Sequence, residues 1–78
     1  MMQAYVLIKT HVGDIHAALG ILRRTEGVVS AYATFGPHDI VALVEAGGLD
    51  ELSDLVARQI QGISEIVDTM TCIFLGRQ

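Results

Sequence analysis

The spacing of apolar residues changes along the chain, and each change marks the start of another expected helix or strand. Residues 3–10 are apolar at nearly every position, which is typical of a strand buried on both faces. Apolar residues then recur at i, i+3, i+4 and i+7, which predicts one buried helical stripe. This stripe consists of Ile15, Ala18, Leu19 and Leu22. We expect Gly13 and Asp14 to open the helix and Gly27 to end it.

The second half of the chain repeats this order after a short turn. Residues 28–35 are rich in β-branched and aromatic side chains, and residues 40–46 form a second apolar run, so both are predicted strands. A second helix is expected over 49–61, followed by a last strand over 65–75. Its buried stripe would be Leu52, Leu55, Val56 and Ile60.

The connections between these elements predict the topology. The tight turn at 36–39 allows only an antiparallel hairpin, and strands joined through helices require right-handed crossovers. We therefore expect residues 1–78 to form a single α+β domain. Its fold would be the ferredoxin-like βαββαβ arrangement, a four-stranded antiparallel sheet with both helices on one face.

The sheet face away from the helices is predicted to be apolar as well, because side chains alternate along a strand. Either Val6, Ile8, Ile40, Ala42 and Val44 face the helices and Tyr5, Leu7, Val41 and Leu43 face away, or the reverse. We expect this second face to hold Leu7, Val41, Leu43, Val67, Ile73 and Leu75. An apolar patch of this kind implies a partner, and we expect that partner to be a second copy of the chain.

Composition supports self-association. The chain has 78 residues and is 51% hydrophobic, so its core is small and its apolar content high. Small domains are usually stabilised by disulfides, metals or oligomerisation. The single cysteine excludes an internal disulfide, and one Cys with three scattered His makes a structural zinc unexpected. We therefore expect oligomerisation to stabilise the domain, beginning with a homodimer.

Charge and targeting signals narrow the function classes. The net charge is −4 and only two basic residues are adjacent, which argues against direct nucleic-acid binding. No apolar run approaches a membrane span. The N-terminus lacks the pattern of a signal peptide, so a cytoplasmic location is expected.

No constellation of residues predicts catalysis or a metal site. We expect His38, in the hairpin turn, to lie at the opposite end of the sheet from His11, so that the histidines do not converge. Cys72 lies within the last strand without a neighbouring base and is expected to be buried. The serines lack a nucleophile motif, and no phosphate-binding glycine loop is present. We therefore expect a non-enzyme without cofactors.

The turn from Gly36 to Asp39 is the most informative polar segment. Gly36 permits an unusual backbone angle, and Pro37 stiffens the turn. The N–H groups of His38 and Asp39 can receive a carboxylate, and the Asp39 side chain can receive an ammonium, which together match a zwitterionic amino acid. Equally, Asp39 can simply cap its own turn.

Two threonines of the last strand form a second candidate group. Thr69 and Thr71 are two residues apart, so their hydroxyl groups share one face of the strand. They either line a polar pocket or reflect the β-propensity of threonine.

Three segments resemble the C-terminal regulatory domain of the Lrp/AsnC (feast/famine) transcription regulators. They are EGVVSAYATFGPHDIVALVEA at 26–46, LDEL at 49–52, and the spaced pattern I-x-G-I-x-x-I-V-D-T-x-T-x-I at 60–73. The resemblance implies a βαββαβ domain that dimerises through its sheet and assembles further, with four dimers giving an octamer. It also implies that amino acids bind between dimers near the Gly-x-x-Asp turn. It implies ligand contacts at Gly36, Pro37, His38 and Asp39, with Thr34, Thr69 and Thr71 in the surroundings.

The chain departs from the family at two points. The family usually carries an N-terminal helix-turn-helix domain, whereas in this chain the first strand begins at Met2, so a stand-alone version without direct DNA binding is expected. The residue before the aspartate is often aromatic in the family but is His38 in this chain, which leaves the identity of the ligand open.

The sequence therefore predicts an oligomeric amino-acid-binding module. Such a module would act on full-length Lrp/AsnC regulators or on amino-acid metabolism. Three alternatives remain open at this point: an ACT-like amino-acid-binding domain, a small enzyme of the dimeric α+β barrel type, and an assembly protein without a ligand.

Overall fold

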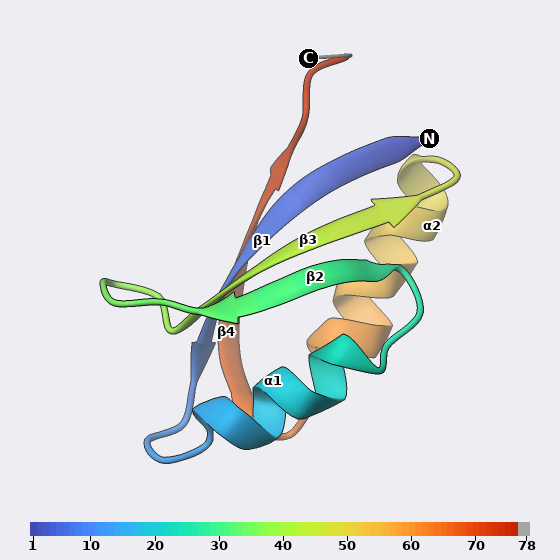
Figure 1. The fold of residues 1–78 in the computed structure, drawn as a ribbon. Helices are drawn as coiled ribbons and strands as arrows, with labels where there is room; N and C mark the ends of the chain where they lie inside the picture. Colours follow the sequence, from blue (N-terminus) through green and yellow to red (C-terminus); the bar gives the residue numbers. More distant parts are fainter. Residues whose placement is uncertain (77–78) are drawn as a thin grey trace.

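The predicted order of elements is present in the computed structural model, which describes residues 1–76 (Figure 1). Its strands are β1 (Met2–Thr10), β2 (Val28–Ala33), β3 (Ile40–Ala46) and β4 (Ile66–Ile73). Its helices are α1 (Ile15–Arg23), α2 (Leu49–Asp54) and the π-helix η1 (Leu55–Ile60), which continues α2 directly.

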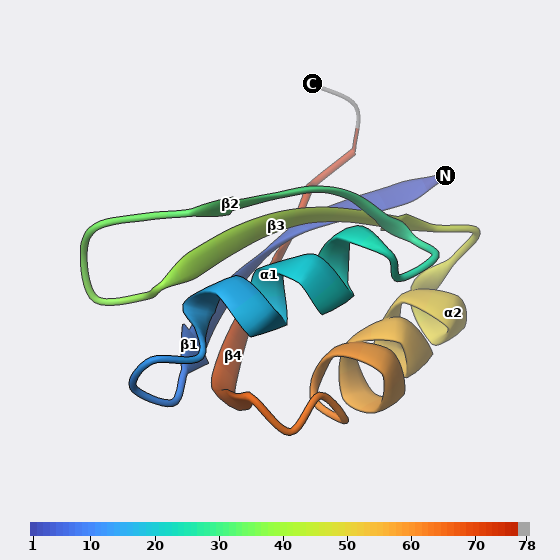
Figure 2. The same ribbon diagram turned by 60° about the horizontal axis from the view of Figure 1, so that its bottom comes forward.

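The four strands form one antiparallel sheet in the order β2-β3-β1-β4. Both helical segments lie on the same face of this sheet, as Figure 2 shows. Each helix connects two strands that are not neighbours, whereas the direct β2–β3 connection joins adjacent strands. The ferredoxin-like topology predicted from the sequence is confirmed.

The core lies between the sheet and the helices. Alternate residues of the two central strands are 0% exposed, and these are Ala4, Val6 and Ile8 of β1 and Ile40, Ala42 and Val44 of β3. The helices contribute Ala18, Leu19 and Leu22 of α1, Leu52 of α2, and Leu55 and Ile60 of η1. Burying one such Leu, Ile or Val side chain stabilises the fold by about 1.5–3 kcal/mol. The first of the two predicted face assignments is therefore the correct one.

Helix α1 ends earlier than its sequence indicates. The last helical residue is Arg23, and the N–H groups of Arg24 and Thr25 cap the helix by donating to Ile21 O and Leu22 O, respectively. Gly27, the predicted terminator, lies instead in the turn into β2, with a φ of +96°. A Cβ at this position would lie 2.8 Å from Leu55 Cδ2, so close packing of η1 also requires glycine there.

The second helix has the predicted extent but not a uniform type. From Leu55 it widens into a π-helix, and the N–H of Gln61 donates to the carbonyl of Val56, five residues earlier, at 2.9 Å. The stripe residues Leu52, Leu55 and Ile60 are buried, and Val56 packs against the core. Apolar periodicity indicated the position of this segment but not the change in its hydrogen-bond pattern.

We call the sheet face away from the helices the open face. Tyr5 and Leu7 of β1 lie on it beside Val41 and Leu43 of β3. Leu7, Val41 and Leu43 are half-buried, whereas Tyr5 is 46% exposed. Its remaining members by register are Gln3, Lys9, Ser30, Tyr32, Glu45, Asp68, Met70 and Cys72.

The expected position of Ile73 on the open face was wrong. Ile73 pairs with Ala4, whose side chain faces the helices, and Val67 lies at a shift of register opposite Lys9 and Thr10. In residues 66–73 both alternating sets of positions contain apolar side chains. Alternation alone therefore could not show which set faces the helices. Cys72 pairs with Tyr5 on the open face and is exposed, contrary to the expectation of a buried thiol.

Candidate functional site

The loop between β2 and β3 is closed by a threonine at its start. The Thr34 N–H donates to the Asp39 carbonyl at 2.9 Å, and the Thr34 hydroxyl donates to the His38 carbonyl at 2.9 Å. Thr34, expected in the surroundings of a ligand, therefore already uses its hydroxyl proton to hold the turn.

Asp39 attaches the loop to the end of β1. Its Oδ2 accepts hydrogen bonds from the Thr10 N–H at 2.8 Å and the Thr10 hydroxyl at 3.3 Å. Its own N–H donates to the Ile8 carbonyl at 2.8 Å. The Asp39 N–H is therefore not available to a ligand carboxylate, which corrects one part of the sequence interpretation. Within residues 1–76, Asp39 Oδ1 and the His38 N–H have no partner.

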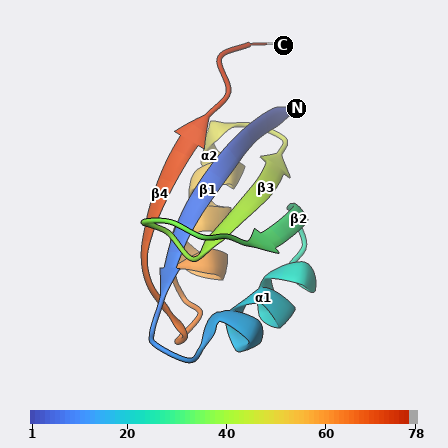
Figure 3. The ribbon, with the colours of Figure 1, turned by 60° about the vertical axis from the view of Figure 1, so that its left-hand side comes forward.

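The tip of the loop is open on the side of Gly36. Gly36 has a φ of +142°, a conformation that L side chains rarely adopt, and no heavy atom lies within 4 Å of a Cβ placed there. The neighbouring Phe35 is fully exposed. As Figure 2 shows, the loop projects from the end of the sheet, and in Figure 3 it passes in front of β1 and β4 rather than between the sheet and the helices. A ligand can therefore reach the backbone at this point directly from solvent.

Lys9 joins this group, although no motif in the sequence pointed to it. Its Nζ donates to the Pro37 carbonyl at 3.0 Å, and the strand alternation places its side chain on the open face. The one signal available in the sequence was that Lys9 is the single lysine of the chain and stands at the end of an otherwise apolar strand.

Thr69 and Thr71 share one face of β4, as predicted. They pair with Ile8 and Val6, so their side chains point to the helix side of the sheet. The Gln61 amide donates to the Thr69 hydroxyl at 2.8 Å beside a shallow depression of about 240 Å³, which Asp68 also lines. No residue of the turn at 36–39 lines this depression.

The expected separation of the histidines was wrong. β1 and β3 are antiparallel neighbours, so the end of β1 lies beside the start of β3, and His11 is at the same end of the sheet as His38. The sequence interpretation did not specify that β1 and β3 are neighbours, and this pairing fixes which ends meet. Over residues 1–76 no group of three or more His, Cys, Asp or Glu side chains is arranged to hold a metal ion.

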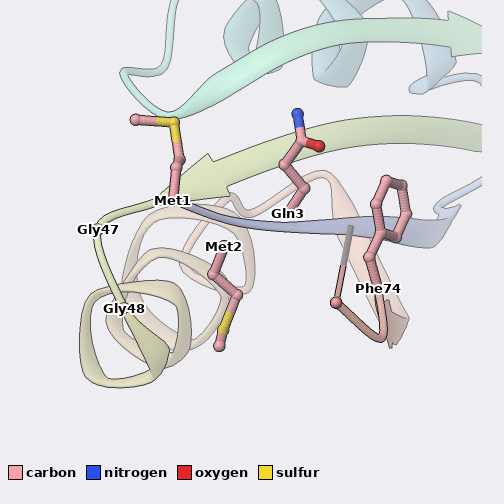
Figure 4. A pocket seen from close by; sticks show the side chains of 7 residues that line it. Met1, Met2, Gln3, Gly47, Gly48 and Phe74 are labelled. Carbon is pink, nitrogen blue, oxygen red and sulfur yellow. The ribbon is translucent and has the colours of Figure 1, made fainter. Parts of the chain in front are cut away.

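A second and larger cavity lies at the other end of the sheet from the turn. It measures about 670 Å³ and is lined by Met1, Met2, Gln3, Gly47, Gly48, Phe74 and Gly76 (Figure 4). None of these side chains carries a charge, and none was predicted as a site residue. The turn at 36–39 therefore remains the better candidate for a polar ligand.

Known proteins share the fold that carries this turn. The family described as the Lrp/AsnC ligand binding domain matches residues 3–77. The chain belongs to this family. No curated protein sequence matches this Lrp/AsnC domain. Within its residues 1–76, no helix is long and apolar enough to cross a membrane.

Solved structures resemble this Lrp/AsnC domain over nearly its whole length. The structure of FFRP-DM1 is 28% identical with a TM-score of 0.93, covering 96% of this chain and 100% of that one. TTHA0845 from Thermus thermophilus is 28% identical with a TM-score of 0.94, covering 100% and 98%. AsnC of E. coli is 30% identical with a TM-score of 0.91, covering 97% of this chain but 52% of its own.

A structure of lower sequence identity is that of a ligand complex. It is the transcriptional regulator NMB0573 from Neisseria meningitidis in complex with L-Met. It is 17% identical with a TM-score of 0.85, covering 95% of this chain and 49% of that one. This likeness shows the fold alone.

Proposed function

We propose that this Lrp/AsnC domain is a non-catalytic module that binds a free amino acid at the turn from Gly36 to Asp39. The observation that carries the proposal is the state of Asp39. Its Oδ2 is held by Thr10, which fixes the turn, while its Oδ1 has no partner in the described chain. A fixed carboxylate with a free acceptor atom suits an ammonium group.

The rest of the turn fits a small zwitterion. The unpaired N–H of His38 is a donor for a carboxylate oxygen, and the open backbone at Gly36 permits close approach. An amino acid in the related fold of the Neisseria regulator supports the same ligand class. In a single chain the turn is exposed and Thr69 and Thr71 do not line it, so we propose that a neighbouring copy completes the enclosure.

We further propose that two copies associate through the open face. Leu7 sits at its centre, paired with Val41 on one side and Met70 on the other, and Met70 is 54% exposed. An exposed apolar sheet face in a chain of 78 residues is a liability that self-association removes. Higher oligomers, up to the proposed octamer, would follow from contacts at the projecting turns.

An enzyme of the dimeric α+β barrel type is disfavoured by the composition of the core. Such enzymes need polar groups between sheet and helices, whereas no buried polar or charged residue occurs within residues 1–76. A binding role uses only the surface groups of the turn, and it therefore fits these observations better. An ACT-like domain would share the topology, but the family match favours the Lrp/AsnC assignment.

A thermal-shift screen of the twenty amino acids tests the binding proposal. A ligand that binds only the folded state must raise the melting temperature. We expect at least one amino acid to do so for the wild-type protein and to fail with Asp39→Asn. Asparagine keeps an oxygen for Thr10 but lacks the charge that receives the ammonium. If no amino acid raises the melting temperature, the ligand-free assembly role replaces this proposal.

The regulatory role has its own test. We propose that the module acts on full-length Lrp/AsnC regulators or on amino-acid metabolism. Pull-down of such a regulator with the wild-type protein, with and without the amino acid found in the screen, should show ligand-dependent association. Absence of association in every condition would remove the regulatory part and leave the binding part intact.

A further inference from the structure

We propose that Lys9 is a ligand-contacting residue of this domain and receives the α-carboxylate of the bound amino acid. The inference rests on the proposed function and assigns one group of the ligand to one side chain. Lys9 takes the place of the Asp39 N–H as the carboxylate donor, because that N–H donates to Ile8 O and is not available.

Lys9 and Asp39 are opposite charges fixed to the same turn. Lys9 Nζ is held by the Pro37 carbonyl at 3.0 Å, and Asp39 Oδ2 is held by Thr10 at 2.8 Å. The two contacts are made by neighbouring residues of β1, Lys9 and Thr10. Even so, no ion pair joins Lys9 to Asp39 within the described residues. The two charges therefore stand apart on one turn without neutralising each other.

Within residues 1–76, the Lys9 ammonium has no other ion-pair partner either. Its register partner across the sheet is Asp68, yet the ion pair found within residues 1–76 is a different one, Arg58 with Asp54. An ammonium has three donors, and the Pro37 carbonyl occupies one of them. The remaining donors face solvent beside the turn, because the Lys9 side chain is exposed.

A zwitterionic α-amino acid placed across this turn supplies both missing partners. Its ammonium would meet Asp39 Oδ1, and its carboxylate would meet Lys9 Nζ with the His38 N–H as a second donor. Charge-assisted hydrogen bonds of this kind are the stronger class, and they discriminate sharply against a neutral isostere. Recognition would then depend on the backbone groups of the ligand, with its side chain directed elsewhere.

Isothermal titration calorimetry with two ligands tests the assignment. The probes are the amino acid that stabilises the wild type most and its carboxamide, which keeps the ammonium but has no carboxylate. We expect the wild type to bind the carboxamide about tenfold or more weakly, since a hydrogen bond to a charged group is worth about that factor. Lys9→Gln should bind the amino acid about tenfold more weakly and the carboxamide nearly unchanged, so that the preference disappears.

Two variants serve as controls. Lys9→Arg keeps the positive charge and should retain the preference for the carboxylate. Arg24→Gln removes one positive charge from an exposed residue just after α1 and should change neither affinity. Sedimentation velocity on all variants separates an effect on ligand binding from an effect on assembly, because Lys9 lies on the open face.

Each other outcome has a definite meaning. If Lys9→Gln keeps the full preference, weakens both ligands equally, or changes only the sedimentation coefficient, Lys9 is not the carboxylate partner and the proposed function stands without it. If the wild type binds no amino acid at all, the proposed function fails and the Lys9 assignment fails with it.

Discussion

Asp39 and Thr10 are joined by two hydrogen bonds across the end of the sheet, from the Thr10 N–H at 2.8 Å and the Thr10 hydroxyl at 3.3 Å to the same carboxylate oxygen. Asp39→Ala removes the acceptor for both. We expect it to lower the free energy of unfolding by about 1–3 kcal/mol, because a half-buried N–H is left unpaired. Urea denaturation measures this loss.

The matched control is Asp39→Asn, which retains an oxygen at the same place. We expect its free energy of unfolding to fall by less than about 1 kcal/mol. Equal losses for the two variants would mean that the link between the turn and β1 does not depend on the acceptor oxygen of residue 39.

Two glycines of positive φ differ in the room around them. At Gly13, with a φ of +87°, nothing lies within 4 Å of an added Cβ, whereas at Gly27 the Cβ would meet Leu55 Cδ2 at 2.8 Å. We expect Gly13→Ala to cost about 1 kcal/mol from backbone strain alone. Gly27→Ala should cost about 2–3 kcal/mol, since overpacking against a buried leucine is added. Chemical denaturation of the pair tests this, and equal costs would show that Leu55 yields freely.

The open face should control self-association. Leu7 lies at its centre, so Leu7→Lys places a charge inside the proposed interface and should shift the protein to smaller species. The control is Val12→Lys, because Val12 is fully exposed in the loop after β1. Sedimentation velocity compares the two. Dissociation by both variants, or by neither, would contradict an interface centred on Leu7.

The single thiol reports on the same surface independently. Cys72 is exposed on the open face of one chain. If a second copy covers this face, the wild-type thiol should react slowly with a maleimide, and Leu7→Lys should accelerate the reaction by about tenfold or more. The rate is followed by mass spectrometry. Equal rates in the wild type and the variant would indicate that this face is uncovered in solution.

Much of this fold could be predicted from periodicity alone. The alternation of β1 and β3 and the stripes of the two helices fixed the elements, and the four-residue turn at 36–39 fixed the hairpin. The family resemblance pointed to the same turn as the candidate site. These features are local or depend on one short connection. They can therefore be predicted from a single sequence.

The errors arose where distant strands meet. Which face Ile73 and Cys72 occupy depends on the register of β4 against β1, which includes a shift after Lys9 that no local pattern marks. His11 and His38 were expected at opposite ends of the sheet for a different reason, because the sequence interpretation did not specify that β1 and β3 are antiparallel neighbours. Lys9 was missed because its contact with the Pro37 carbonyl exists only once β1 and the loop are side by side.

The central claim is that an amino acid binds at the turn from Gly36 to Asp39. Hydrogen–deuterium exchange of the wild-type protein tests it most directly, with and without the amino acid chosen by the thermal-shift screen. We expect the ligand to slow exchange in the peptide covering residues 34–40, where the His38 N–H has no partner in the described chain. Unchanged exchange there, with protection instead around the cavity at Met2 and Gly48, would contradict binding at this turn.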